Sequence, residues 1–165
     1  MAIVSDSSPL VCYAKIGRLD LLRALFEHVV IPPAVYIEVV VRGAGRPGAA
    51  DVASAAWIQT QALAQPHLVE SIGGHLDRGE AEAITLALEI HQRNILIDDD
   101  DGRTIAKRQG LSVIGSVGVL LLARSAGLLT SDDVRVLLDA LRSAGLYLSD
   151  ALYRQVLAQG ETTRE

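Results

Sequence analysis

Short apolar runs alternate along this chain with longer segments whose apolar residues recur at helical spacing. A continuous run of three or four apolar residues is typical of a buried strand. Five runs are predicted to be strands: Ala2–Ser5, Val29–Ile31, Trp57–Gln59, Asn94–Ile97 and Ser112–Ile114. The segments between and after them are predicted to be helices: Arg18–Phe26, Ala34–Val41, Ala50–Ala55, Asp77–His91, Gly102–Gln109, Val117–Ser125, Thr130–Ala144 and Ser149–Gln159. This alternation favours an α/β fold with a parallel sheet covered on both faces.

In three segments, the periodicity of apolar residues does not by itself decide the secondary structure. Ser7-Ser8-Pro9 follows the first strand, and a hydroxyl cap with a proline at the first helical position predicts that a helix begins there. Ser116 is predicted to cap the helix after it in the same way. The segment Ala34–Val41 is rich in β-branched residues, which favour strands. Its two-proline start and its helical apolar stripe favour a helix, which is our prediction.

Composition sets the limits of the molecule. The chain has 165 residues, half of them hydrophobic, which suits one domain over residues 1–160 with a frayed polar tail at 161–165. Its apolar runs are too short to span a bilayer, and its start does not resemble a secretory leader, so we expect a cytoplasmic protein. Cys12 is the single cysteine, and its apolar neighbours predict a small buried side chain.

Two acids and a serine directly follow predicted strands. Asp6, Asp98 and Ser116 each come after a short apolar run, and ligands of open parallel sheets collect outside the carboxyl ends of the strands. We therefore expect the three side chains to line one crevice. The alternatives are local: Asp6 could start a turn, and the run 98–101 could be a solvated acidic loop. Asp99 is a candidate partner of Asp98, and the register within the four aspartates stays open.

Two glutamates lie on the apolar stripes of predicted helices. Glu80 is the lone acid on its stripe, and Glu38 shares a face with valines. Each has a structural alternative, because Glu80 would also favour the positive end of its helix and Glu38 could pair with Arg42, four residues on. Glu82 lies about 200° around the helix from Glu80, so we expect it to be solvated and treat it as a secondary candidate.

Clustered carboxylates indicate a metal site. Buried carboxylates are costly unless a cation or hydrogen bonds compensate them. Mg²⁺ and Mn²⁺ prefer oxygen ligands, and one or two such ions can activate a water and neutralise charge that develops on a phosphate. The sequence therefore predicts metal-assisted phosphodiester chemistry at four acids: Asp6, Glu38, Glu80 and Asp98.

The charge balance is the main objection to a nucleic-acid substrate. The formal net charge is −5, whereas proteins that bind nucleic acid usually present basic surfaces. RNA binding would need a local basic patch or a metal that inverts the local field. Arg103 and Lys107 could hold a phosphate near the metal. The alternative interpretation is an exposed helix face, or a salt bridge from Arg103 to Asp99.

Five segments, in this order, resemble the PIN-domain family, in the toxin-like (VapC-like) branch of nucleases from toxin–antitoxin pairs. They are Val4–Leu10, Ile31–Val35 leading to Glu38, Leu76–Ile84, Leu96–Asp99 with Gly102-Arg103, and Val113–Leu120. The resemblance runs from about residue 3 to the C-terminal helices. It implies a three-layer α/β/α fold with a central parallel sheet of about four to five strands.

The resemblance also implies a role for each site residue. The four metal-binding and catalytic acids would be Asp6, Glu38, Glu80 and Asp98; Ser7 or Ser8 would support the first acid, and Ser116 would line the site. The chain departs from the family at the third acid, which is more often Asp in the toxins, whereas this chain offers Glu80 and Glu82.

The implied activity is that of a Mg²⁺- or Mn²⁺-dependent endoribonuclease, the toxin-like component of a toxin–antitoxin pair. Its expected partners are an RNA substrate, an antitoxin protein and a second copy of the chain, with no membrane. Two other interpretations stay open. One is an inactive PIN-like module whose acids bind a basic partner or whose fold binds RNA. The other is a Mg²⁺-dependent phosphotransferase or phosphatase with Asp6 as nucleophile.

Overall fold

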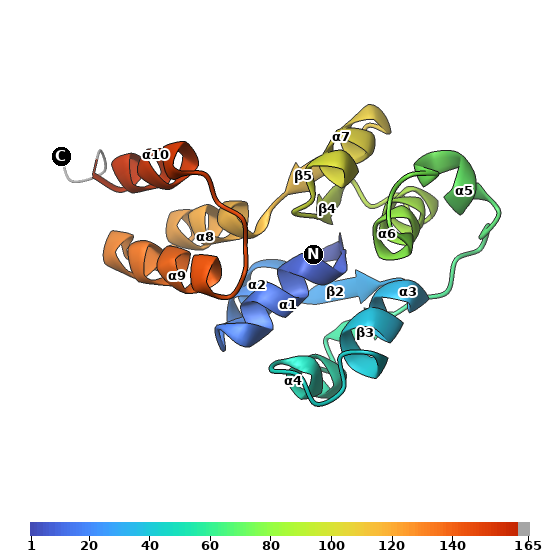
Figure 1. The fold of residues 1–165 in the computed structure, drawn as a ribbon, viewed down its shortest axis with the longest axis horizontal. Helices are drawn as coiled ribbons and strands as arrows, with labels where there is room; N and C mark the ends of the chain where they lie inside the picture. The colour runs from blue at the N-terminus through green and yellow to red at the C-terminus, as the bar shows by residue number, and fades with distance from the viewer. Residues whose placement is uncertain (162–165) are drawn as a thin grey trace.

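A computed structural model describes residues 1–161 and shows five parallel strands in one sheet (Figure 1). The strand order is β3-β2-β1-β4-β5, so β1 lies at the centre. The strands are β1 (Ala2–Ser5), β2 (His28–Ile31), β3 (Ile58–Thr60), β4 (Asn94–Leu96) and β5 (Ser112–Ile114). All five coincide with the predicted apolar runs to within one residue. The predicted α/β fold with a central parallel sheet is confirmed.

The strands are continuously apolar because each face of the sheet is covered. Successive side chains point to opposite faces, so Ile3 joins one hydrophobic cluster and Val4 the other. Leu96 and Ile95 of β4 divide in the same way. The protein therefore has the three layers expected of an α/β/α fold.

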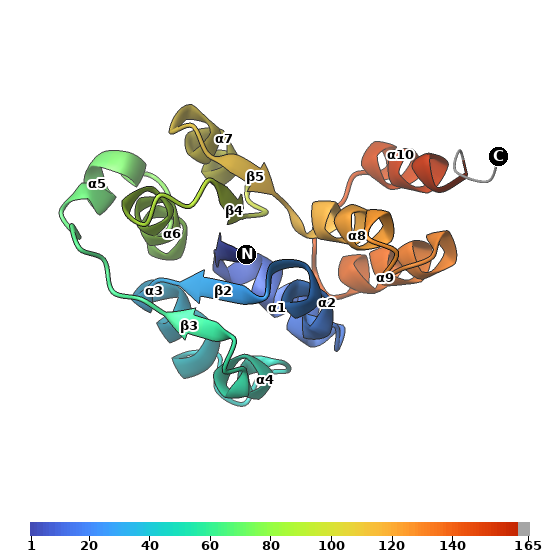
Figure 2. The same cartoon turned by 180° about the vertical axis from the view of Figure 1, so that it is seen from behind.

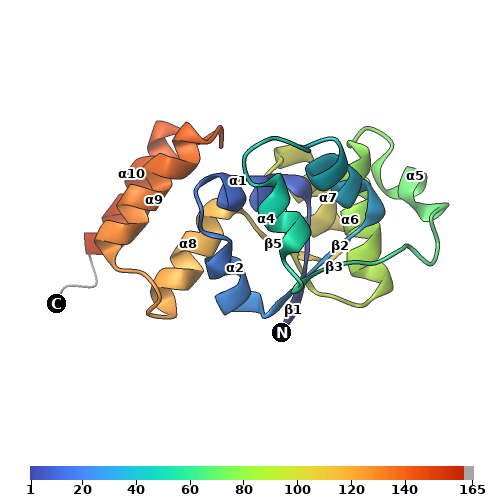
Figure 3. The same cartoon turned by 90° about the horizontal axis from the view of Figure 1, so that it is seen from below.

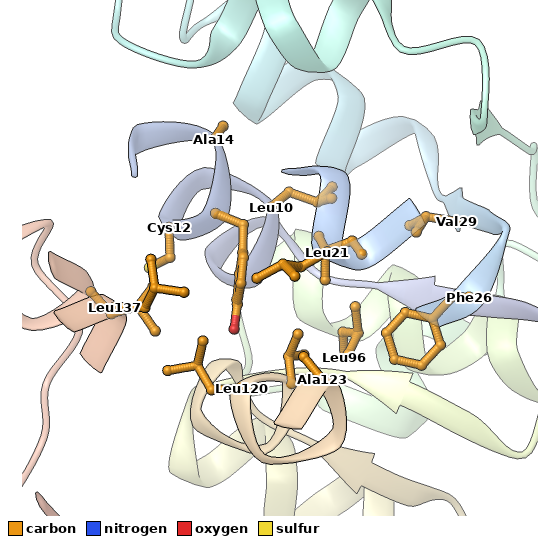
Figure 4. Packing of buried hydrophobic residues seen from close by; sticks show 14 of the residues in the cluster. Leu10, Cys12, Ala14, Leu21, Phe26, Val29, Leu96, Leu120, Ala123 and Leu137 are labelled. Atoms are coloured by element: carbon orange, nitrogen blue, oxygen red, sulfur yellow. The ribbon is translucent and has the colours of Figure 1, made fainter. Parts of the chain in front are cut away.

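Helices α1 (Ser7–Lys15), α2 (Leu19–Phe26) and α8 (Ser116–Ser125) cover one face. Figure 4 shows Leu10 of α1, Leu21 and Phe26 of α2, and Leu120 and Ala123 of α8 gathered in one cluster with Leu96. Cys12 is buried in the same cluster, as predicted. This packing fixes the start of α1, and hence Asp6, over the carboxyl end of the sheet.

The opposite face is covered by α6 (Arg78–Glu89) and α7 (Asp100–Arg108). Every residue of α6 from Gly79 to Ala87 is buried, because α3 and α5 also pack against this helix. The remaining helical segments are α3 (Pro33–Tyr36), the π-helical η1 (Ile37–Val41), α4 (Ala49–Ser54) and α5 (Leu68–Gly73). The predicted helix Ala34–Val41 is thus helical, with a π-helical second half. Helix α5 was not predicted.

Two further helices complete the described chain, α9 (Ser131–Ser143) and α10 (Asp150–Glu161). They lie beside α8 at one end of the molecule, and α5 lies at the other end (Figures 2 and 3). Residues 162–165, most of the predicted tail, lie outside the described residues. Within residues 1–161, the structure has no helix that combines the length and the apolarity needed to cross a bilayer.

Two predicted helix starts are wrong in detail, and both corrections concern the site. Asp6, rather than a serine, is the N-cap of α1, and Pro9 is the third residue of the helix. Gly115 is the N-cap of α8, and Ser116 is its first residue. The hydroxyls of Ser7, Ser8 and Ser116 therefore make no helix-capping hydrogen bond and donate to carboxylates instead.

Candidate metal and nuclease site

Asp6 lies at the centre of the candidate site. Its backbone N–H donates to the carbonyl oxygen of Leu96 (2.9 Å), which continues the β1–β4 pairing and places the residue at the carboxyl end of the central strand. Its side chain is 4% exposed, and within the described chain its Oδ1 atom is buried with no hydrogen-bond partner. A buried carboxylate oxygen without a partner is costly unless a cation or a proton compensates it.

The backbone at Gly79 shows how closely three acids approach one another. A methyl group built on Gly79 would lie 3.2 Å from Glu38 Oε2, 3.4 Å from Asp6 Oδ1 and 3.4 Å from Asp77 Oδ1. Three carboxylates, from the residue after β1, from η1 and from the start of α6, therefore surround one point. Glycine at this position leaves the space between them open.

Asp77 belongs to this cluster although we did not predict it as a site residue. It is the N-cap of α6, and its Oδ1 accepts from the backbone N–H of Glu80 at 2.8 Å. An Asp three residues before a Glu, ahead of an apolar stripe, is a helix-start pattern that was available in the sequence. The pattern explains the cap, but the approach to Asp6 depends on the packing of α6 against β1.

The electrostatic interactions support one acidic cluster. Burial, followed by the charges of Asp77, Glu80 and Glu38, raises the pKa of Asp6 to about 8, against the lowering effect of a hydrogen bond from the Ser7 backbone. Burial, followed by the charges of Asp77 and Asp99, raises the pKa of Glu80 to about 7. Asp6 and Glu80 thus form the buried floor of the cluster. Three exposed acids form its rim: Glu38, Asp77 and Asp99.

Asp98 is held beside this cluster by hydroxyl groups. Its Oδ2 accepts from Ser116 Oγ at 2.6 Å and from Ser8 Oγ at 3.1 Å, and its Oδ1 accepts from the Ser116 backbone N–H at 2.7 Å. The neighbouring Ser7 donates its hydroxyl to Glu38 Oε2 at 2.6 Å. The start of α1 therefore fixes two of the four predicted acids through consecutive serines.

The run of aspartates divides into different roles. Asp98 is half-buried in the hydroxyl network, whereas Asp99 is exposed and caps α7 by accepting from the N–H groups of Asp101 and Gly102. Asp100 and Asp101 are exposed in the first turn of α7. Of the four, Asp99 acts on the cluster through its charge on Glu80, and Asp98 is bonded to Ser8, two residues after Asp6.

Glu82 corrects the sequence analysis. We expected it to be solvated, but it is 4% exposed because α3 covers that side of α6. Its Oε2 accepts from the backbone N–H of Ala34 at 2.9 Å, and its Oε1 accepts from Arg78 Nε at 2.8 Å. Both carboxylate oxygens are thus engaged, one by Ala34 of α3 and the other by Arg78 of the same helix, so Glu82 links α6 to α3 through Ala34.

Two pockets flank the acids. One, of about 710 Å³, lies along β5, α8 and α10 and includes Asp98 and Arg103 in its lining. The other, of about 410 Å³, lies between η1 and α6 and is lined by Glu38, Asp77, Arg42 and Arg78, among others. Arginines therefore border the acidic cluster on two sides despite the negative net charge.

The predicted phosphate-binding pair differs in position. Arg103 is half-buried near Asp98: a methyl group built on Gly115 would lie 2.5 Å from its Nη1 and 3.2 Å from Asp98 Oδ1. Its Nη1 donates to the carbonyl oxygen of Ile97 at 3.4 Å, and the described chain shows no salt bridge to Asp99. Lys107 is exposed and lines neither of the two pockets.

The residues fit a hard divalent cation. Within residues 1–161, no three Asp, Glu, His or Cys side chains are placed, as they stand, so that they could hold a metal ion together. The buried and unpartnered Asp6 Oδ1, the all-oxygen donor set and the open space beside Gly79 nevertheless suit a Mg²⁺-like ion. The acids nearest this space are Asp6, Glu38 and Asp77, and the charge of Glu80 also acts on Asp6.

A comparison with protein families agrees with this arrangement. The model of a family described as PIN domain matches residues 2–162, nearly the whole chain. This chain belongs to the PIN-domain family. PIN domains are generally nucleases that act on nucleic acid and use divalent metal ions. No match was found among functionally curated proteins. Family membership therefore supports nuclease-type chemistry for this PIN domain in general.

Proposed function

We propose that this PIN domain is a Mg²⁺- or Mn²⁺-dependent endoribonuclease whose site is built by Asp6, Glu38, Glu80 and Asp98, with Asp77 as a further acid. The observation that carries the proposal is the buried Asp6 Oδ1, which has no hydrogen-bond partner and lies among carboxylates from two other segments, η1 and the start of α6. When bound, a divalent ion supplies activation of a water and neutralises charge that develops on the phosphate.

The chain's own residues hold the site in a fixed geometry. Ser7 orients Glu38, and Ser8 and Ser116 orient Asp98 with three hydrogen bonds. Such support reduces the reorganisation that is needed when ligands close around an ion. Arg103 beside Asp98 offers guanidinium donors to a phosphate of the RNA backbone.

We further propose that the protein is the toxin-like component of a toxin–antitoxin pair, on the basis of the sequence resemblance. The exposed acidic rim of Glu38, Asp77 and Asp99 suits an antitoxin that inserts a basic side chain into the cluster. A homodimer is proposed on the same basis. The affinity of the antitoxin would then be measured for the dimer rather than for a single chain.

The deciding experiment compares RNA cleavage by wild type, Asp6→Asn and Asp51→Asn. Asp51 is an exposed acid on α4, away from the acidic cluster, and serves as the matched control. With Mn²⁺, we expect wild type and Asp51→Asn to cut a mixed RNA pool and Asp6→Asn to lose about 100-fold or more of the rate. EDTA should abolish cleavage by all three proteins.

Thermal denaturation with and without Mn²⁺ separates catalysis from metal binding. Mn²⁺ should raise the melting temperature of wild type and of Asp51→Asn but not that of Asp6→Asn. Full cleavage activity in Asp6→Asn would refute the proposed site. Neither cleavage nor a Mn²⁺ effect in wild type would refute the nuclease and favour the inactive interaction module.

A further inference from the structure

The lining of the larger of the two pockets changes from charged to apolar along its length. At the end near β4 and β5 it is lined by Asp98, Asp100 and Arg103, and the side chains of Asp98 and Arg103 both lie beside Gly115. Farther along, its walls are apolar side chains from α8 and α10, among them Leu121 and Leu152. A ligand that fits this pocket has one charged end near the metal site and one apolar body.

Tyr147 lies at the rim of the apolar part. It is in the connection between α9 and α10, lines the pocket, and is 88% exposed, the highest value among the large exposed hydrophobic residues of the described chain. Leu122 and Leu152, both 40% exposed, also line the pocket. An exposed aromatic ring beside exposed leucines loses the free energy of burial unless a ligand covers it.

We infer that this pocket is a base-binding subsite for an unpaired nucleotide of the RNA substrate, with the base stacked on Tyr147 and its phosphate directed to Arg103. The inference rests on the proposed nuclease function, since Asp98 belongs both to the pocket and to the candidate site. The volume of about 710 Å³ lies within the range typical of small-molecule pockets, about 300–1,000 Å³.

The change from charged to apolar lining favours a nucleotide over a protein segment. A nucleotide joins a flat apolar face to an anionic phosphate, which matches a tyrosine ring and leucines at one end and an arginine at the other. The smaller pocket beyond Glu38 has a different character, because Arg42 and Arg78 line it without an aromatic side chain. An RNA strand would thus place a base in the larger pocket and a phosphate near the smaller one.

The test measures RNA binding in an Asp6→Asn background, in which cleavage is prevented, by fluorescence anisotropy with Mg²⁺. The probes are a labelled 12-nucleotide oligouridylate and an abasic oligomer of the same length. The second substitutions are Tyr147→Ala, Tyr147→Phe and Tyr36→Ala. Tyr36 is an exposed tyrosine on α3 that lines neither pocket, so it is the matched control. Circular dichroism checks that each variant folds.

We expect Tyr147→Ala to weaken oligouridylate binding about 5- to 150-fold and Tyr147→Phe to retain it, because the stacking ring is kept. Tyr36→Ala should bind oligouridylate as tightly as the Asp6→Asn parent protein does. The abasic oligomer should bind Tyr147→Ala and this parent with equal affinity. Unchanged oligouridylate binding by Tyr147→Ala would overturn the inference and leave the pocket to a protein segment. Equal losses for both probes, or no oligouridylate binding by the parent, would also overturn it.

Because this assay needs no cleavage, its outcome is independent of the nuclease test. If wild type cleaves RNA but RNA binding does not depend on Tyr147, the base subsite is refuted and the proposed nuclease function is retained. An inactive wild type that binds oligouridylate through Tyr147 would refute the nuclease and retain the subsite.

Discussion

At the scale of single residues, the site is defined by carboxylates whose environment favours the neutral form in the absence of a cation. Asp6 and Glu80 are buried beside other acids, and burial is the largest cause of the rise in each pKa. Such groups are a stability cost that the fold retains, which is typical of functional sites.

This cost predicts how the stability of the metal-free protein depends on pH. The pKa of Asp6 rises from 3.8 to about 8 on folding, so between these values the folded state binds more protons than the unfolded state. The free energy of unfolding should therefore fall as pH rises through this window, with a limit of about 1.4 kcal/mol per pH unit for each such group. Glu80 adds to the fall between pH 4.5 and about 7.

Melting temperatures measured from pH 5 to 8 in EDTA check this prediction. Asp6→Asn should show a shallower decline than wild type, because asparagine does not titrate, and it should be the more stable protein at pH 8. The Asp51→Asn control should follow wild type. Parallel curves for wild type and Asp6→Asn would show that Asp6 is already ionised in the folded protein at low pH.

At the scale of elements, two glutamates of α6 have opposite roles although they are two residues apart. Glu80 belongs to the acidic cluster, whereas Glu82 accepts from the Ala34 N–H of α3 and from Arg78 of its own helix. Conservative substitutions to glutamine distinguish them, because the side-chain volume is kept.

Glu82→Gln should lower stability by about 1–3 kcal/mol, since its NH2 group would replace one accepting oxygen and face a donor, either the Ala34 N–H or Arg78 Nε. It should retain the Mn²⁺-induced rise in melting temperature. Glu80→Gln should show the reverse: stability in EDTA that is equal to or above that of wild type, and loss of the Mn²⁺ effect. Thermal melts of both variants with Mn²⁺ and with EDTA provide the measurement, and matching responses of the two would contradict the division.

The same helix shows why part of the site was predictable from sequence and part was not. The apolar stripe correctly places Glu80 toward the sheet, because the stripe is a local property of α6. It misplaces Glu82, since the burial of the opposite side comes from α3 and α5, which are distant in sequence. For the same reason, strand ends indicated Asp6, Asp98 and Ser116, but the sequence did not indicate the approach of Asp77 to Asp6. The expectation that the hydroxyl of Ser7 or Ser8 supports Asp6 is wrong, because these hydroxyls bind Glu38 and Asp98.

At the scale of the whole molecule, a net charge of −5 limits how the protein can bind RNA. Long-range attraction is unfavourable, so affinity must come from groups close to the site: arginines, a bound cation and base stacking. Three arginines line the two pockets, Arg42 and Arg78 on one side and Arg103 on the other. The protein should therefore bind RNA with few phosphate contacts.

Few phosphate contacts predict a weak dependence of RNA affinity on salt. Each phosphate contact to single-stranded RNA contributes about −0.7 to the slope of log K against log salt concentration, so three arginines predict a slope of roughly −2. Arg103→Ala should reduce the magnitude by about 0.7. Anisotropy titrations of oligouridylate onto Asp6→Asn at several KCl concentrations and constant Mg²⁺ measure both slopes. A slope of about −5 or steeper would require a basic surface away from the site, because three arginines release too few counterions to produce it.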